Sequence, residues 1–335
     1  LPALARTYAL HFAQLEVVAE LDRIFGGDLD DEAARRELET RAAGLKAIAT
    51  SHAKATIGEC REACGGAGYL SENRLGELAA DTEVFTTFEG DNTILLQLVA
   101  KSVLTGYRDA FGDLDTLGTV SFVAEQVWET VVERTAVREL VQRLTDDLVP
   151  GRERDEDLTD RDYQLGMFRW REEHLISTAA RRLKAGIDDG LDPFVVFNAA
   201  QDHVLECSRA HVDRRVLESF VAGIGRCEDS ANKAVLERVC DLYALSVMER
   251  ERAWYQEHGR ISSTRAKALI RAVNELCGQI RPHAFDLVDA FGIPDVVLGA
   301  PIGIPGGEAS RTSAREIDDP GADVRDLLGP SATPA

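Results

Sequence analysis

Apolar residues recur every three or four positions along most of the chain, and no stretch shows the strict alternation of a β-strand. The first such run covers residues 3–25 and places five apolar side chains on one helical face: Leu4, Tyr8, Phe12, Leu15 and Val18. A second long helix is expected from residue 32 to about residue 64, where the pair Gly65-Gly66 ends it. This period predicts an all-α fold.

A change of pattern predicts two helical bundles in series. The segment Gly112-Asp113-Leu114-Asp115 reads as a boundary, so the first bundle is expected over 1–112 and the second over 118–302. From residue 303 the helical period is lost and Gly, Pro, Ser and acidic residues dominate, which predicts a mostly disordered tail over 303–335. Helices of the second bundle are expected near 118–147, 161–187, 194–222, 229–257 and 262–289.

Charge and cysteine content limit the classes of function. The net charge of −20 argues against nucleic acid as a partner, although a local basic cluster could still meet the phosphates of a small ligand. No apolar run is long enough to predict a membrane span. The six cysteines are scattered and form no CxxC pair, which favours reduced thiols in a cytosol. Arg outnumbers Lys and the last residues are not a peroxisomal SKL-type signal, so a cytoplasmic protein of a bacterium is expected.

The stretch Thr87-Phe88-Glu89-Gly90-Asp91-Asn92-Thr93 carries the candidate catalytic residue. Glu89 stands between an apolar run and a turn-like Gly-Asp-Asn sequence, just before a predicted helix start. A carboxylate among apolar neighbours can be desolvated, which raises its pKa and suits it to proton abstraction. The alternative is that Glu89 is an ordinary acid favoured by the helix dipole.

A second stretch, CREACGGAGY (60–69), ends the long predicted helix. Its glycines follow a helix and lack the six-residue spacing of a dinucleotide-binding fingerprint, so this is not a Rossmann motif. Taken alone, the glycines indicate a helix C-cap or a place where the backbone closely approaches a ligand.

Together these stretches resemble the C-terminal half of an acyl-CoA oxidase, a flavoenzyme of the acyl-CoA dehydrogenase superfamily. CREACGGAGY and TFEGDNTILLQ occur in the order and at the separation typical of that family. The resemblance also includes LPALARTYALHF (1–12), AGLKA (43–47) and AFGIPDVVLGAPI (290–302), and so covers most of the chain.

The resemblance implies oxidation of a fatty acyl-CoA to a trans-2-enoyl-CoA, as in fatty acid β-oxidation. Glu89 would remove the α-proton while the β-hydrogen leaves as hydride to FAD, and O₂ would then be reduced to hydrogen peroxide. The backbone N–H of Glu89 and a flavin hydroxyl would hold the thioester carbonyl. Gly90 would leave room for the substrate.

The resemblance further implies a homodimer, because the glycine loop of one subunit lies against the flavin of its neighbour. By position, the flavin contacts would be Glu62, Ala63, Cys64, Gly65, Gly66, Asp91, Asn92 and Thr93. Two positions depart from the family pattern: Glu62 replaces the glutamine usual in the dehydrogenases, and Ala67 replaces the histidine of many eukaryotic oxidases.

Two alternatives to the oxidase remain open. One is a dehydrogenase that passes its electrons to an electron-transfer protein. The other is a non-catalytic helical assembly module, because the family's flavin-binding N-terminal half would precede residue 1 and is expected as a missing half or a partner chain.

One predicted helix carries three residues of metal-ligating types. His203, Cys207 and His211 lie at i, i+4 and i+8 on one predicted helix, a spacing that suits pairs of metal ligands. One metal ion rarely takes three ligands from two turns of a straight helix, so we expect no metal here.

Overall fold

The fold is built of helices. The computed structural model describes residues 1–28, 32–109, 157–294, 297 and 299–303, and within these ranges no strand occurs. The prediction of an all-α fold is therefore confirmed.

The first part of the described chain contains four α-helices and three short helical turns. The bounds are α1 (Pro2–Arg23), a π-turn (Ile24–Asp28), α2 (Glu32–Ala63), two 3₁₀ turns (Gly65–Tyr69 and Ser71–Asn73), α3 (Leu75–Val84) and α4 (Asn92–Asp109). The later part continues with α7 (Arg161–Asp188), α8 (Pro193–Ala199), α9 (Gln201–Gly225), α10 (Ser230–Arg250), α11 (Arg252–Glu257), α12 (Ser263–Ile280), a 3₁₀ turn (Arg281–His283), α13 (Ala284–Asp289) and a last 3₁₀ turn (Pro301–Gly303).

Side-chain caps explain why several helices begin where they do. Asp160 accepts a hydrogen bond from the backbone N–H of Tyr163, and Asp229 accepts one from Asn232. Asp192 accepts from two backbone N–H groups at the start of α8, and Ser262 accepts from the backbone N–H of Arg265 at the start of α12. Each cap satisfies a donor that the helix itself leaves unpaired.

Three of the predicted helices are interrupted. The segment expected over 194–222 is divided at Ala200, and the one over 229–257 is divided at Glu251. The segment over 262–289 changes to a 3₁₀ turn at Pro282, which lacks the backbone donor that a continuous helix needs. The predicted helix over 118–147, the boundary near 112–117 and the tail beyond 303 lie outside the described residues.

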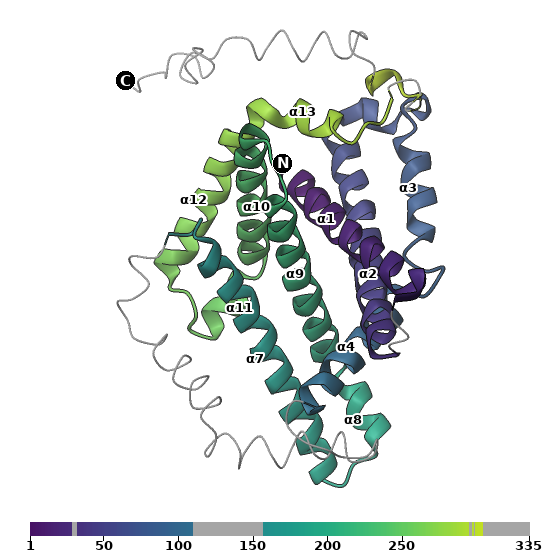
Figure 1. Cartoon of the computed structure of the whole chain (residues 1–335), viewed down its shortest axis with the longest axis vertical. Coiled ribbons are helices and arrows are strands. Elements are labelled where there is room, and N and C mark those ends of the chain that lie inside the picture. The colour runs from purple at the N-terminus through teal and green to yellow at the C-terminus, as the bar shows by residue number, and fades with distance from the viewer. Residues whose placement is uncertain (29–31, 110–156, 295–296, 298, 304–335) are drawn as a thin grey trace, which may run out of the picture. The chain divides into compact units, whose positions relative to one another are not determined.

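The described chain divides into two compact units. Unit 1 comprises 1–53 and 84–288, and unit 2 comprises 54–83 and the part after residue 288. In unit 1, α9 contacts α1, α4, α7 and α10 (Figure 1). Helices from both predicted bundles therefore share one core, while the prediction of two domains in series, with its boundary outside the described residues, stays a prediction.

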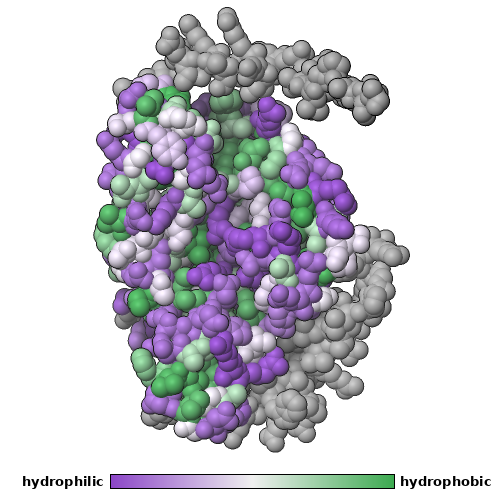
Figure 2. Space-filling view, turned by 180° about the vertical axis from the view of Figure 1, so that it is seen from behind, coloured by the Kyte–Doolittle hydropathy of each residue, from purple (hydrophilic) through white to green (hydrophobic). Residues whose placement is uncertain are grey.

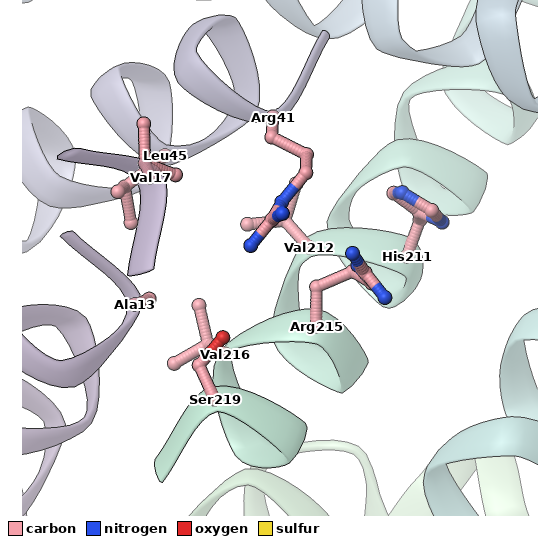
Figure 3. A pocket seen from close by; sticks show the side chains of 9 residues that line it. All are labelled: Ala13, Val17, Arg41, Leu45, His211, Val212, Arg215, Val216 and Ser219. Atoms are coloured by element: carbon pink, nitrogen blue, oxygen red, sulfur yellow. The ribbon is translucent and has the colours of Figure 1, made fainter. Parts of the chain in front are cut away.

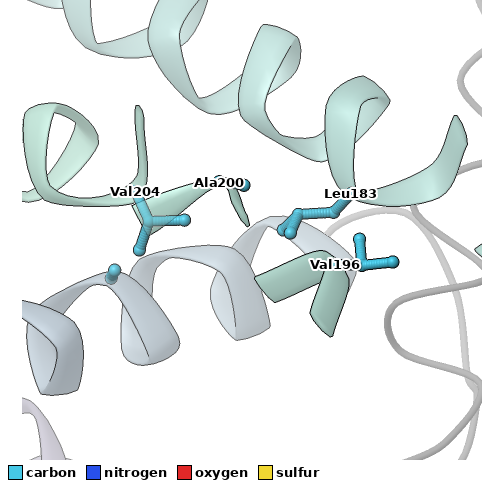
Figure 4. Close-up of a cluster of buried hydrophobic side chains, with 5 residues drawn as sticks. Leu183, Val196, Ala200 and Val204 are labelled. Atoms are coloured by element: carbon cyan, nitrogen blue, oxygen red, sulfur yellow. The ribbon is translucent and has the colours of Figure 1, made fainter. Parts of the chain in front are cut away.

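Small and branched apolar side chains pack together between the helices of unit 1 and form its core. One cluster joins α7, α8, α4 and the start of α9; Figure 4 shows four of its members, Leu183, Val196, Ala200 and Val204, around a common centre. Elsewhere the Phe12 ring of α1 stacks on Phe220 of α9 at 4.9 Å between centroids. Close contact there requires Gly223, because a Cβ at this position would lie 2.2 Å from the Phe12 ring.

Buried charges in unit 1 are paired. The Asp213 carboxylate of α9 is 2% exposed and accepts hydrogen bonds from Arg6 at 3.2 Å and Arg250 at 2.8 Å. These contacts connect α1, α9 and α10. Because an unpaired buried charge costs several kcal/mol, Asp213 makes the register of these three helices specific.

The surface is largely polar. Figure 2 shows hydrophilic residues over much of one face, with hydrophobic residues in separate patches between them. None of the helices in the described ranges combines the length and the apolar character that crossing a bilayer requires.

Candidate functional site

The turn that carries Glu89 connects α3 to α4 within a few residues. The backbone N–H groups of Thr87 and Phe88 both donate to the carbonyl of Val84, each at 3.0 Å, and continue the last turn of α3. The N–H of Asn92 then donates to the carbonyl of Thr86 at 3.0 Å. These bonds fix a compact turn over 85–91, which we call the Glu89 turn.

Glu89 has an unusual backbone conformation. Its φ of +57° is in the left-handed region, and among the described residues only Arg74 shares this feature without being glycine. For a residue with a Cβ this region costs about 1–2 kcal/mol. Gly90 follows at φ +104°, where a Cβ would lie 2.9 Å from the Leu95 side chain. The strain at Glu89 is therefore maintained by its surroundings.

The start of α4 follows the sequence prediction. Asp91 precedes the first helical residue, and its Oδ1 accepts a hydrogen bond from the backbone N–H of Thr93 at 2.8 Å. Asp91 is thus an N-cap, as the Gly-Asp-Asn sequence predicts. Its side chain is engaged with the helix, while Thr93 is exposed.

The Asn92 side chain points back to α2. Its Nδ2 lies 3.0 Å from the Ala47 carbonyl, 2.9 Å from Thr50 Oγ1 and 3.0 Å from Ser51 Oγ. Its Oδ1 accepts from Lys46 Nζ at 3.0 Å, and the same ammonium donates to the Gly90 carbonyl at 2.7 Å. Side chains and backbone of residues 46–51 therefore hold the far end of the Glu89 turn.

The surroundings of Glu89 are exposed and apolar. Glu89 itself is exposed, so within this chain its carboxylate is not desolvated as the flanking sequence suggested. The neighbouring large apolar side chains are exposed as well: Val84, Phe85, Phe88, Ile94 and Leu98. Exposed apolar residues in such a group are typical of a surface that another molecule covers.

The glycine loop after α2 lies in unit 2. Gly65 has φ +55°, and a Cβ built on Gly65 or Gly66 meets nothing within 4 Å, so this part of the backbone is open. Gly68 is different, because a Cβ there would lie 2.0 Å from the Arg61 carbonyl oxygen. The loop therefore folds back on α2 at Gly68 and presents Gly65 and Gly66 outward.

Asn73 connects the glycine loop to the end of the described chain. Its side chain is 6% exposed. Its Nδ2 donates to the Ala67 carbonyl at 2.8 Å, and its Oδ1 accepts from the backbone N–H of Ile302 at 3.1 Å. One amide thus joins two backbone segments that are far apart in sequence.

The two stretches predicted to bind flavin fall in different units, and each has exposed backbone. Glu62, Ala63, Gly65 and Gly66 are exposed and Cys64 is half-buried in unit 2. In unit 1 Glu89, Gly90, Asp91 and Thr93 are exposed, whereas the half-buried Asn92 uses its side chain on α2. The backbone at Gly65 and Gly66 is open, as close approach of a cofactor would require, and Thr93 is exposed in unit 1. The Asn92 side chain does not reach outward.

The two histidines with the spacing of metal ligands have other contacts. His203 Nε2 lies 3.0 Å from Thr178 Oγ1, His211 Nδ1 lies 2.7 Å from Glu172 Oε1, and Cys207 is fully buried. Among the residues that the structure describes, no group of three or more His, Cys, Asp or Glu side chains is arranged to hold a metal ion.

A small pocket between α1, α2 and α9 is structural in character (Figure 3). Its Arg41 is paired with Glu20 at 2.7 Å, and its His211 with Glu172. Burial raises the pKa of Glu172, but hydrogen bonds from His211 and Arg214 outweigh burial and hold that pKa below its usual range. The charged groups around the pocket are thus engaged within the bundle. Its lining is Ala13, Val17, Arg41, Leu45, His211, Val212, Arg215, Val216 and Ser219.

The family models match both ends of this architecture. Residues 1–104 match the model "Acyl-CoA oxidase, C-alpha1 domain", and residues 160–312 match the model "Acyl-CoA oxidase". The chain belongs to the acyl-CoA oxidase family and corresponds to its helical C-terminal portion.

Individual relatives agree with this assignment. Acyl-coenzyme A oxidase 2, peroxisomal, of Arabidopsis thaliana is 34% identical over 302 residues, which is 90% of this chain and 42% of that protein. The crystal structure of a tomato acyl-CoA oxidase has a TM-score of 0.76 at 23% identity, and the match covers 98% of this chain and 49% of that one. An acyl-CoA oxidase-2 of Caenorhabditis elegans, described with FAD, ascaroside-CoA and ATP bound, has a TM-score of 0.74 at 20% identity over 99% of this chain and 46% of that one. The chain thus spans somewhat less than half the length of these relatives.

The comparison corrects the expected localisation. The sequence indicated a cytoplasmic bacterial protein, but the named relatives are eukaryotic, and those from Arabidopsis, rat and human are named as peroxisomal. That expectation is therefore wrong. Arginine preference and scattered cysteines report on codon usage and redox state, and neither distinguishes a peroxisome from a bacterial cytosol.

Proposed function

We propose that this chain is the C-terminal part of an FAD-dependent acyl-CoA oxidase and that Glu89 is its catalytic base. The observation that carries the proposal is the conformation of Glu89, a side-chain-bearing residue held in the left-handed region at the start of α4. Strained residues persist where the surrounding structure maintains them, and they are concentrated at active sites. The family assignment then supplies the reaction class.

Glu89 and Gly90 would have different roles in the reaction. The Glu89 carboxylate removes the α-proton of the acyl thioester. Its backbone N–H donates to the thioester carbonyl oxygen, where negative charge develops. Gly90, without a side chain, lets the thioester approach the carboxylate. The exposed apolar side chains around Glu89 would become covered in the complete enzyme, which would exclude water from the surroundings of the base.

FAD, when bound, would supply the acceptor for the β-hydrogen, which leaves as hydride, and O₂ would reoxidise the reduced cofactor with formation of hydrogen peroxide. The exposed backbone of the glycine loop, from Glu62 through Ala63, Cys64 and Gly65 to Gly66, would contact the cofactor of the neighbouring subunit. Asp91, Asn92 and Thr93 at the start of α4 would contact the flavin as well. For Asn92 the contact would come from its backbone, because its side chain is engaged with α2.

The test is Glu89→Gln in the complete enzyme. Gln preserves the shape and the left-handed backbone strain but cannot accept the proton, so it isolates the carboxylate. We expect anaerobic reduction of the flavin by acyl-CoA to slow on the order of 10²–10⁴-fold, with acyl-CoA binding retained. The matched control is Glu275→Gln, an exposed glutamate of α12. If Glu89→Gln reduces its flavin as fast as the parent, Glu89 is only a helix-start acid.

Repeating the parent reaction in air distinguishes the oxidase from the dehydrogenase alternative. Prompt formation of hydrogen peroxide supports the oxidase. A reduced flavin that persists until an electron-transfer protein is added would support the dehydrogenase. Absence of flavin reduction in the parent itself would favour a helical assembly module.

A homodimer is part of the proposal, since the glycine loop would contact the neighbouring subunit's cofactor. Support comes from α1 and the π-turn after it, where Leu15, Val18, Leu21 and Phe25 are between 42% and 72% exposed. We expect light scattering of the complete enzyme at micromolar concentration to give twice the subunit mass. A monodisperse monomer would contradict this expectation.

A further inference from the structure

The AGLKA segment (43–47) of α2 lies outside the proposed catalytic residues, yet its Lys46 contacts the Glu89 turn. Gly44 is buried where α2 meets α9, and a Cβ there would lie 2.6 Å from Val212 Cγ2. Ala43 and Ala47 are buried on the same helix. These small residues set α2 close to its neighbours and thereby fix the base of the Lys46 side chain.

Lys46 donates to two oxygen atoms at the end of the Glu89 turn. Its Nζ donates to the Gly90 carbonyl at 2.7 Å and to Asn92 Oδ1 at 3.0 Å. The Gly90 carbonyl belongs to the residue directly after Glu89. A hydrogen bond from an ammonium group to this oxygen therefore restricts the rotation of the Gly90–Asp91 peptide, one residue beyond Glu89.

Two hydroxyl groups of α2 further restrict the position of Asn92. Thr50 Oγ1 donates to the Lys46 carbonyl at 2.9 Å and so accepts from Asn92 Nδ2, which lies 2.9 Å away. Ser51 Oγ donates to the Ala47 carbonyl at 2.8 Å and likewise accepts from Asn92. The hydroxyls are oriented by α2 itself, so the amide of Asn92 meets preorganised acceptors.

The charge of Lys46 is not where helix electrostatics would place it. The N-terminus of a helix carries partial positive charge and favours acidic neighbours. Lys46 nevertheless places an ammonium group against the first residue of α4. The two hydrogen bonds, rather than the dipole, account for this position.

We infer that Lys46 is a positioning residue for Glu89. It holds the strained Glu89–Gly90 backbone in the geometry that proton abstraction needs, and it acts only through Glu89. This inference rests on the proposed function of Glu89. Since a displacement of about 1 Å in a reacting group can cost on the order of 10² in rate, loosening this turn should lower turnover and leave substrate binding intact.

The experiment uses Lys46→Met in the complete enzyme, which keeps the length of the apolar stem and removes the donors. We expect kcat for acyl-CoA oxidation to fall about 10-fold with KM changed less than about 2-fold. Lys46→Arg, which retains donors and charge, should restore most of kcat. The control is Lys54→Met on the same helix, whose exposed ion pair with Glu83 contributes little.

A double-mutant cycle separates positioning from general stability. If Lys46 acts through Glu89, Lys46→Met should have little further effect in the Glu89→Gln background. If Lys46→Met lowers kcat by the same factor in the Glu89→Gln background as in the parent, the inference is overturned. It is also overturned if kcat is unchanged in Lys46→Met although Glu89→Gln is slow. An unchanged rate in Glu89→Gln would overturn both proposals. Hydrogen exchange at the backbone N–H of Asn92 should accelerate in Lys46→Met. This measurement tests directly whether Lys46 stabilises the Glu89 turn.

Discussion

The Glu89 turn and the glycine loop are both exposed segments at helix ends, but they are maintained by different means. The Glu89 turn contains a non-glycine residue at φ +57° and is held by side chains of a second helix. The glycine loop reaches φ +55° at a glycine, where no strain arises, and is held by close backbone approach and one buried amide. A segment that must present a side chain needs external support, whereas one that presents backbone needs chiefly the absence of side chains.

The substitution with the largest expected effect on stability is Gly68→Ala, in the glycine loop. The new Cβ would lie 2.0 Å from the Arg61 carbonyl oxygen, and a backbone atom cannot move aside as a side chain can. We expect the free energy of unfolding to fall by about 3 kcal/mol, measured by urea denaturation of this chain.

Gly66→Ala is the matched control for that substitution. Nothing lies within 4 Å of its Cβ, so the free energy of unfolding should stay within about 0.5 kcal/mol of the parent. Equal losses in the two variants would mean that the loop depends on glycine flexibility in general and not on the approach to α2 at Gly68.

A smaller effect is expected from Asn73→Asp, which tests the buried amide. The carboxylate can still accept from the Ile302 N–H, but it cannot donate to the Ala67 carbonyl. Loss of a buried hydrogen bond with an unsatisfied partner typically costs about 2 kcal/mol. Urea denaturation at neutral pH measures this loss.

The same variant should respond to pH in a defined direction. Burial and the facing Ala67 carbonyl would raise the pKa of the new carboxyl in the folded state above its unfolded value. The folded state then binds the proton more readily, so stability is regained as pH falls through the folded-state pKa, because a protonated Asp can donate to Ala67. Asn274→Asp, an exposed change on α12, should show no such recovery. A loss in Asn73→Asp that does not change with pH would contradict this account of the amide.

The sequence predicted local features well. The all-α class followed from the apolar period, and the start of α4 followed from the Gly-Asp-Asn sequence, since caps are local chemistry. The break at Pro282 is also visible in sequence, because proline has no backbone donor, yet the predicted helix near 262–289 continued through it.

What the sequence could not predict depends on distant contacts. Lys46 reads as a solvated lysine, and its partner Gly90 lies 44 residues away. Asn73 reads as a loop residue, while its second partner Ile302 is 229 residues away. The exposure of Glu89 likewise depends on what packs around the turn. The apolar residues beside it in sequence do not show whether their side chains cover the carboxylate.

The conformation of Glu89 has a consequence for engineering. A procedure that selects substitutions only for thermal stability would favour Gly or Asn at position 89, since these residues occupy the left-handed region at little cost. Such a library would be enriched in robust chains that lack the proposed base. Screens on this fold should therefore fix position 89 before any stabilising mutation is chosen.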